Sequence, residues 1–225
     1  MSASSASPSA TGGSSATAVP AVRAPLQARS RESFARVQDA ALALLRERGD
    51  DSFTLAEVSA RSGVSTGSIY GRIASKDALI RLVHAREMTR IDAVTVPALE
   101  QAAVHDTLDA TVHALVAAYA GLLQEEAEVL RPFMLRAAHD PEVARTGHES
   151  SERARQAFCD ALLRHGAEVR RPEPEVAADW CHTVVFSVLA RRLGLGSTVE
   201  GADDVDLSVM VGNLSSMVTS FLVTG

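Results

Sequence analysis

Apolar residues recur three and four positions apart along most of this chain of 225 residues, which is the spacing of one face of an α-helix. No segment shows the strict alternation of a half-buried strand, and the chain has no internal repeat. We therefore expect an all-α protein. The apolar pattern, together with the Gly and Pro residues that interrupt it, predicts helices over residues 31–48, 55–62, 66–73, 76–92, 108–123, 126–138, 142–165, 175–193 and 206–223.

The segment 54–79 contains closely spaced helix-capping signals. Thr54 and Glu57 form the T-x-x-E pattern of a capping box, which satisfies two unpaired backbone donors at the start of a helix. Gly63 can adopt the left-handed conformation that ends this helix, and Ser65 is suited to cap the next one. Only the short turn Gly-Val-Ser separates the two helices, as a DNA-binding helix-turn-helix requires.

The outward face of the second helix in this segment is small, polar and free of carboxylates. Ile69 and Ile73 can point toward a core, and the start of such a helix faces the bases in DNA complexes. Gly71 indicates either a close backbone approach to DNA or a frayed helix end, because glycine costs roughly 1 kcal/mol in a helix relative to Ala. The residues left on the outward face are Thr66, Gly67, Ser68, Tyr70, Gly71 and Arg72.

Residues 63–70 (GVSTGSIY) and 75–79 (SKDAL) resemble the TetR family of one-component bacterial regulators, and the resemblance covers about residues 31–85. It implies an N-terminal three-helix DNA-binding domain followed by a helical bundle for ligand binding and dimerisation. It also implies phosphate contacts by Thr54, Tyr70 and Lys76. The remainder of the chain agrees with the family only in its length and helical character.

Two positions depart from the family pattern, since Arg72 and Ile73 stand where an aromatic residue or His usually precedes Phe. Arg72 can still hold a phosphate or read a guanine, so the departure concerns the operator sequence more than DNA binding. Lys76 is the only lysine among 22 basic residues, and it is either the implied phosphate contact or a solvated surface side chain. The candidate DNA-binding residues are Thr54, Ser65, Thr66, Gly67, Ser68, Tyr70, Gly71, Arg72 and Lys76.

Charge is divided unevenly along the chain, although its net charge is −6. Residues 1–90 carry 12 basic and 8 acidic side chains, whereas residues 91–225 carry 10 basic and 20 acidic ones. Such asymmetry favours a basic nucleic-acid-binding part and an acidic body. The phosphate contribution to DNA affinity requires local positive charge only.

Three segments follow from these patterns: an arm at 1–30, a helix-turn-helix domain at 31–78 and a ligand-binding and dimerisation domain at 79–225. The arm contains too few apolar residues to order itself, so it is either an unstructured extension or an arm that reaches a minor groove. The last helix is apolar over a wide arc. The family resemblance implies a homodimer interface formed by the last two helices, and the alternative is a terminal helix that is simply buried.

The body contains scarce large side chains that can line a cavity between helices or pack in an ordinary core, namely Tyr119, Phe133, Met134, Phe158 and Trp180. No catalytic motif, metal-binding spacing or cofactor motif is present, so we expect neither an enzyme nor a metal or cofactor site. The absence of a long apolar run or a signal-peptide core favours a cytoplasmic protein without a membrane partner.

Together these features predict a homodimeric repressor that a small apolar effector releases from a near-palindromic site on double-stranded DNA. The alternative is a helical small-molecule-binding protein without sequence-specific DNA binding.

Overall fold

The computed structural model describes residues 23–195 and 206–224, and every regular element within these ranges is a helix. The predicted all-α fold is therefore confirmed. The helices are α1 (Arg23–Arg48), α2 (Leu55–Ser62), α3 (Thr66–Tyr70), α4 (Lys76–Ala102), α5 (Leu108–Ala137), α6 (Pro141–Leu163), α7 (Pro174–Arg192) and α8 (Leu207–Val223). No helix in the described parts is long and apolar enough to cross a membrane.

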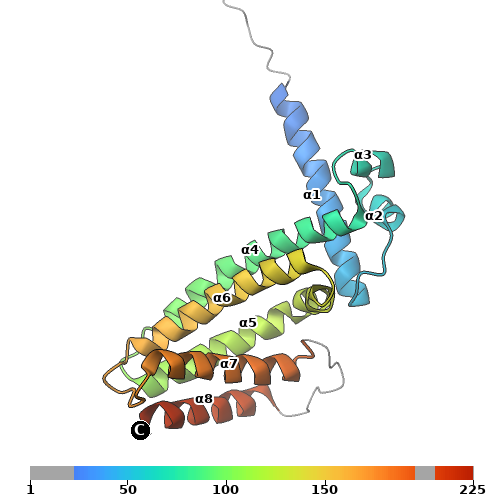
Figure 1. Cartoon of the computed structure of the whole chain (residues 1–225). Coiled ribbons are helices and arrows are strands. Elements are labelled where there is room, and N and C mark those ends of the chain that lie inside the picture. The colour runs from blue at the N-terminus through green and yellow to red at the C-terminus, as the bar shows by residue number, and fades with distance from the viewer. Residues whose placement is uncertain (1–22, 196–205, 225) are drawn as a thin grey trace, which may run out of the picture.

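The helices form two groups that α4 connects. Figure 1 shows α1, α2 and α3 at one end of the molecule, which we call the head together with the first turns of α4. The body consists of the rest of α4, of α5 and α6, which lie beside it, and of α7 and α8. Within the body, α7 packs on α6, and α8 packs mainly on α5.

The head is packed onto the body and shares a hydrophobic core with it. Val58 of α2, Ile69 of α3 and Leu79 of α4 are all fully buried in this core. The same cluster of buried residues extends to Phe133 of α5 and Val143 of α6. Because packed cores deform little, a movement of α5 or α6 is transmitted to the head.

Two predicted helix breaks are wrong. α4 does not end near Asp92 but continues through Pro97 to Ala102, and α5 is one helix where two helices, 108–123 and 126–138, were predicted. A proline inside a helix removes one hydrogen bond and costs about 3 kcal/mol. Packing of these long helices against each other and against α6 offsets that local cost at Pro97 of α4 and at Pro132 of α5.

The ends of two head helices also differ from the predictions. α1 begins at Arg23 and not at Arg31, so residues 23–30 are helical, while residues 1–22 of the predicted arm lie outside the described residues. Once a helix is nucleated its extension costs little, and Pro25 lies in the first turn, where a missing N–H is tolerated. α3 ends at Tyr70 because Gly71 closes it, which favours the helix-end interpretation of this glycine.

The two cysteines belong to the core of the body. Cys159 and Cys181 are buried free thiols, and burial raises the pKa of the Cys159 thiol to about 11 and that of the Cys181 thiol to about 12. Thiols that ionise only at such a high pH are unreactive at neutral pH. Both residues therefore act as small hydrophobic side chains.

Candidate nucleic-acid interface and effector cavity

Three local interactions build the helix-turn-helix of the head. The Thr54 amide donates to Glu57 Oε2 at 2.7 Å and the Glu57 amide donates to Thr54 Oγ1 at 3.3 Å, so the predicted capping box is present. Gly63 ends α2 with a φ of 69°, which side-chain-bearing residues rarely adopt. Ser65 caps α3, since its hydroxyl accepts from the Ser68 amide at 3.3 Å. These caps fix the direction in which α3 leaves α2.

α3 is anchored by one buried side chain and presents its other side to solvent. Ile69 is fully buried in the head, whereas Tyr70 is 55% exposed. Thr66 is half-buried at the start of the helix. The remaining exposed candidates are Ser65, Gly67, Ser68, Gly71 and Arg72, so the predicted residues from 65 to 72 do share one carboxylate-free surface. Such a surface permits close approach to base edges and phosphates.

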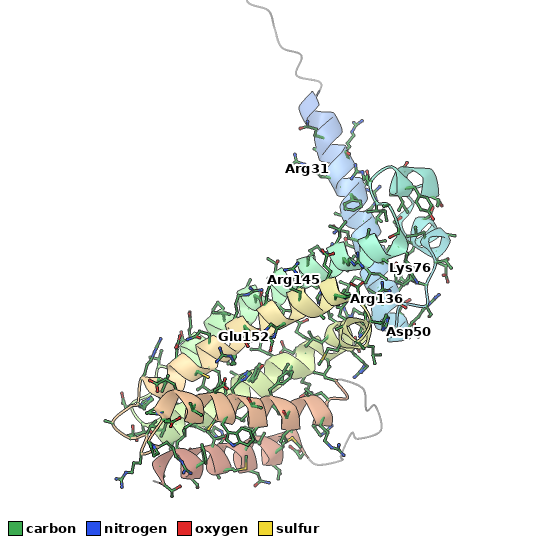
Figure 2. The ribbon with its side chains drawn as sticks, viewed as in Figure 1. Arg31, Asp50, Lys76, Arg136, Arg145 and Glu152 are labelled. Atoms are coloured by element: carbon green, nitrogen blue, oxygen red, sulfur yellow. The ribbon has the colours of Figure 1, made fainter. Side chains whose placement is uncertain are left out.

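α1 contributes positive charge beside α3 from residues that the sequence assigned to an arm and not to a helix. Arg72 donates to the Ser30 hydroxyl of α1, and its guanidinium lies 5.3 Å from the centre of the Phe34 ring. Arg29 and Arg72 line one groove between α1 and α3. Arg31 is exposed on the part of α1 that continues past α3 (Figure 2). Reading residues up to 30 as an unstructured arm concealed this helical extension.

Lys76 and Thr54 are engaged within the protein. The Lys76 ammonium donates to the carbonyl oxygens of Asp51 at 2.6 Å and of Phe53 at 3.3 Å, and it lies 5.2 Å from the centre of the Phe53 ring. The Thr54 hydroxyl donates to Glu57 Oε2 at 2.8 Å. Both side chains must exchange these partners to bind a phosphate, so their implied phosphate contacts stay predictions.

A cavity of about 380 Å³ lies between α4, α5 and α6 in the body. Tyr119, Phe133 and Met134 line it, as predicted for a cavity between body helices. Phe158 does not line it but lies behind Tyr119, with ring centres 6.1 Å apart. The expectation for Trp180 is corrected, because this side chain is 57% exposed on the outer side of α7. A large apolar side chain on a predicted helix such as α7 does not by itself show whether that side chain faces the core or the solvent.

His84 of α4 is a polar cavity residue that sequence reasoning missed. Its side chain is 3% exposed, its ring centre lies 4.7 Å from that of Phe133, and it makes no hydrogen bond among the described contacts. Burial lowers the pKa of His84 to about 4, and attraction to the Asp140 carboxylate opposes this shift only in part. The imidazole is therefore neutral at pH 7. Met88, four residues later, lies on the same inner face of α4. This helical spacing between His84 and an apolar residue is a signal in the sequence that could have placed His84 on the buried face.

Two carboxylates also line the cavity, and both are paired with arginines. Asp92 accepts from the Ser150 hydroxyl at 2.5 Å and from Arg153 Nε at 2.9 Å. Glu126 accepts two hydrogen bonds from Arg90, at 2.8 and 2.5 Å. No Lys or Arg is among the described lining residues. The cavity is thus mostly apolar. Its polar lining includes the two paired carboxylates and side chains for which no hydrogen bond is described, namely His84, Thr95, His148 and Ser151.

Arg136, in the last turn of α5, connects the head with the body (Figure 2). Its guanidinium donates to Asp51 before α2, to Asp77 of α4 at 2.6 Å, and to Asp140 Oδ2 at 3.1 Å. Asp140 is buried at the start of α6, where it caps the helix. Burial alone would raise the pKa of Asp140, but hydrogen bonds from Arg81 and Arg136 outweigh burial and hold it below its usual range.

Comparison with known proteins connects this geometry to a family. Residues 38–83 match the family model described as bacterial regulatory proteins, tetR family. This range contains about the last three turns of α1, all of α2 and α3, and the start of α4. Comparison with curated protein sequences gives no match.

Solved structures share the fold over nearly the whole chain. A protein from Mesorhizobium loti MAFF303099 described as a TetR-family transcriptional regulator superposes with a TM-score of 0.70 at 16% identity, over 86% of this chain and 96% of its own. A transcriptional regulator from Pseudomonas aeruginosa PAO1 gives a TM-score of 0.64 at 16% identity, over 90% and 95%. The regulator FadR from Bacillus subtilis, solved with stearoyl-CoA, gives 0.60 at 13% identity, over 84% and 98%.

Likeness at these identities establishes the fold, and the family model establishes the nature of the head. Residues 38–83 are therefore similar to the tetR-family model, within a chain that shares its fold with TetR-family transcriptional regulators of known structure.

Proposed function

We propose that this chain is a homodimeric repressor that binds a near-palindromic operator through α3 and leaves it when a small apolar molecule occupies the body cavity. The observation that carries the proposal is the surface of α3, a short capped helix that Ile69 fixes to the head while its polar residues face solvent. A helix presented in this way can enter a major groove with its first residues at the bases.

The roles of the α3 residues follow from their positions. Thr66, Gly67 and Ser68 form the first turn and contact base edges in this proposal. Tyr70 and Arg72 lie at the end of the helix and bind phosphates, with Arg29 of α1 adding positive charge in the same groove. Phosphate contacts position the protein, and base contacts select the sequence.

Dimerisation is supported by apolar side chains on the outer surface of α7 and α8. Val176 and Trp180 of α7 are 62% and 57% exposed, and Val209 and Met217 of α8 are 53% and 47% exposed. Single exposed apolar residues are ordinary, but a group on two adjacent helices indicates a protein interface. A twofold interface there pairs two heads, which can then bind half-sites about 34–36 Å apart.

The response to an effector is supported by the shared walls of the cavity and the head. α4 and α6 line the cavity, α4 begins in the head, and Asp140 at the start of α6 is bonded to Arg136. A ligand that fits only one arrangement of α4 and α6 shifts the population of head positions. The apolar lining suits an effector with an apolar body, and the stearoyl-CoA of the FadR structure also has a long apolar chain.

The proposal is tested by selecting the purified full chain against random duplex DNA and sequencing the bound fraction. We expect an enriched near-palindrome with half-site centres about one helical turn apart. Ser68→Ala should change the enriched sequence, whereas Tyr70→Phe should weaken binding to all sequences alike. A folded dimer that enriches no sequence at low salt would refute the proposed operator binding.

A further inference from the structure

The inner face of α4 places two polar groups at the ends of an apolar stripe in the cavity. His84, Met88, Ile91 and Thr95 all line the cavity and follow one another at helical spacing. With a rise of 1.5 Å per residue, His84 and Thr95 are about 16 Å apart along the helix axis. His84 lies at the end nearer the head, because α4 begins there.

His84 has unused hydrogen-bonding capacity that faces this cavity. A neutral imidazole carries one donor and one acceptor nitrogen, and neither makes a hydrogen bond among the described contacts. Opposite the ring, α6 has Gly147, where an added Cβ would lie 3.9 Å from His84 Nε2. The edge of the imidazole is therefore not covered by a side chain at this position of α6. A ligand hydroxyl or carbonyl group in the cavity can therefore supply a hydrogen-bond partner to the imidazole.

The charges around the cavity disfavour an ionised ligand. An anionic group would meet Asp92 and Glu126 with no Lys or Arg among the described lining residues. A cationic group would compete with Arg153 for Asp92 and with Arg90 for Glu126, and the latter arginine holds its partner through two hydrogen bonds. Transfer of an unpaired charge into an apolar cavity is strongly unfavourable.

Resting on the effector response proposed above, we propose that the effector is an uncharged, mainly apolar molecule whose hydroxyl or carbonyl group hydrogen-bonds to His84. An apolar cavity of about 150 Å³ binds benzene, so the present volume holds a molecule of about 15 non-hydrogen atoms. The ligand contacts α4 through His84 and α6 beside Gly147.

The test is isothermal titration of the full-length protein at pH 7.5 with 1-decanol, decanoate and decylamine, which share one chain and differ in head-group charge. We expect 1-decanol to bind at least tenfold more tightly than either ion. Tighter binding of decylamine would assign the ligand to Asp92 and Glu126 and overturn the proposal. Tighter binding of decanoate, or no binding of 1-decanol, would also overturn it.

Substitutions test whether His84 is the anchor, that is, the hydrogen-bond partner of the ligand. His84→Phe should weaken 1-decanol about tenfold, because the buried hydroxyl loses its partner, and His84→Gln should retain most of the affinity. His182→Gln is the matched control, since His182 is similarly buried but is not itself among the lining residues, and a glutamine can still bond to Tyr119. If Thr95→Val, and not His84→Phe, abolishes the advantage of the alcohol, the anchor is wrong.

Operator release is measured separately from binding. If 1-decanol binds through His84 without releasing the selected DNA, the ligand class stands and the proposed regulatory response fails. If the protein selects no DNA at all, the titrations still decide the ligand class by themselves.

Discussion

Acidification from pH 7.5 to pH 5.0 should destabilise the fold through two buried histidines. His84 and His182 are 3% and 4% exposed, on α4 and α7. Burial lowers the pKa of each to about 4, and a nearby charge on Arg155 lowers that of His182 further. The carboxylate of Asp140 raises the pKa of His84, and the carboxylates of Asp179 and Glu152 raise the pKa of His182. In neither case does this attraction overcome the effect of burial.

The sign of the effect follows from proton binding in the two states. In the unfolded chain a histidine binds a proton below about pH 6.5, whereas in the fold these two bind one only below about pH 4. Between these values the unfolded state holds more protons, so stability falls as pH falls. At pH 5.0, about 1.5 units below the ordinary pKa of histidine, each of the two residues lowers the free energy of unfolding by about 2 kcal/mol. The two together lower it by about 4 kcal/mol.

The assay is urea unfolding followed by circular dichroism at several values between pH 7.5 and 5.0, a range above the ordinary pKa of Asp and Glu. Each variant is compared with its own stability at pH 7.5. Replacing His84 with Phe, or His182 with Gln, should remove about half of the pH-dependent loss, and the double variant should remove nearly all of it. An equal loss in wild type and double variant would refute the assignment to these histidines.

Three further changes test other parts of the structure. Gly63→Ala should destabilise the head by about 1–2 kcal/mol, because a side chain is strained at positive φ, and faster hydrogen exchange in α2 and α3 should report it. Arg136→Gln should cost about 1–3 kcal/mol in urea unfolding, because buried carboxylate contacts at the junction are lost, whereas Arg145→Gln, in an exposed pair, should cost less than about 0.5 kcal/mol. Trp180→Asp should give monomers in sedimentation, whereas Val104→Asp, equally exposed but on the loop before α5, should leave the dimer intact; dimers of both variants would place the interface elsewhere.

The sequence by itself determined the features that depend on residues near one another in the chain. The capping box of Thr54 and Glu57, the left-handed Gly63 and the cap at Ser65 were all predicted from residue type and spacing, and all are present. These signals are local because each joins a side chain to a backbone group no more than a few residues away. Helical periodicity likewise predicted the all-α fold.

Only the tertiary structure decided features that join distant segments. The sequence pattern predicted that one helix ends near Asp92 and that another is interrupted at residues 124–125, but packing carries α4 through Pro97 and α5 across the predicted interruption. Lys76 is the residue that the family resemblance implies, yet its ammonium bonds to carbonyl groups more than twenty residues earlier. A pattern of side chains along one helix does not contain these partners.

The cavity shows the same division most clearly. In the sequence, Tyr119 and Trp180 are both large, scarce side chains on predicted helices. In the structure, Tyr119 lines the cavity, whereas Trp180 lies on the surface. His84 is one of seven histidines, and its place in the cavity depends on α5 and α6, which enclose it. Burial, pairing and pKa depend on neighbours from other helices, so they exist only once the chain has folded.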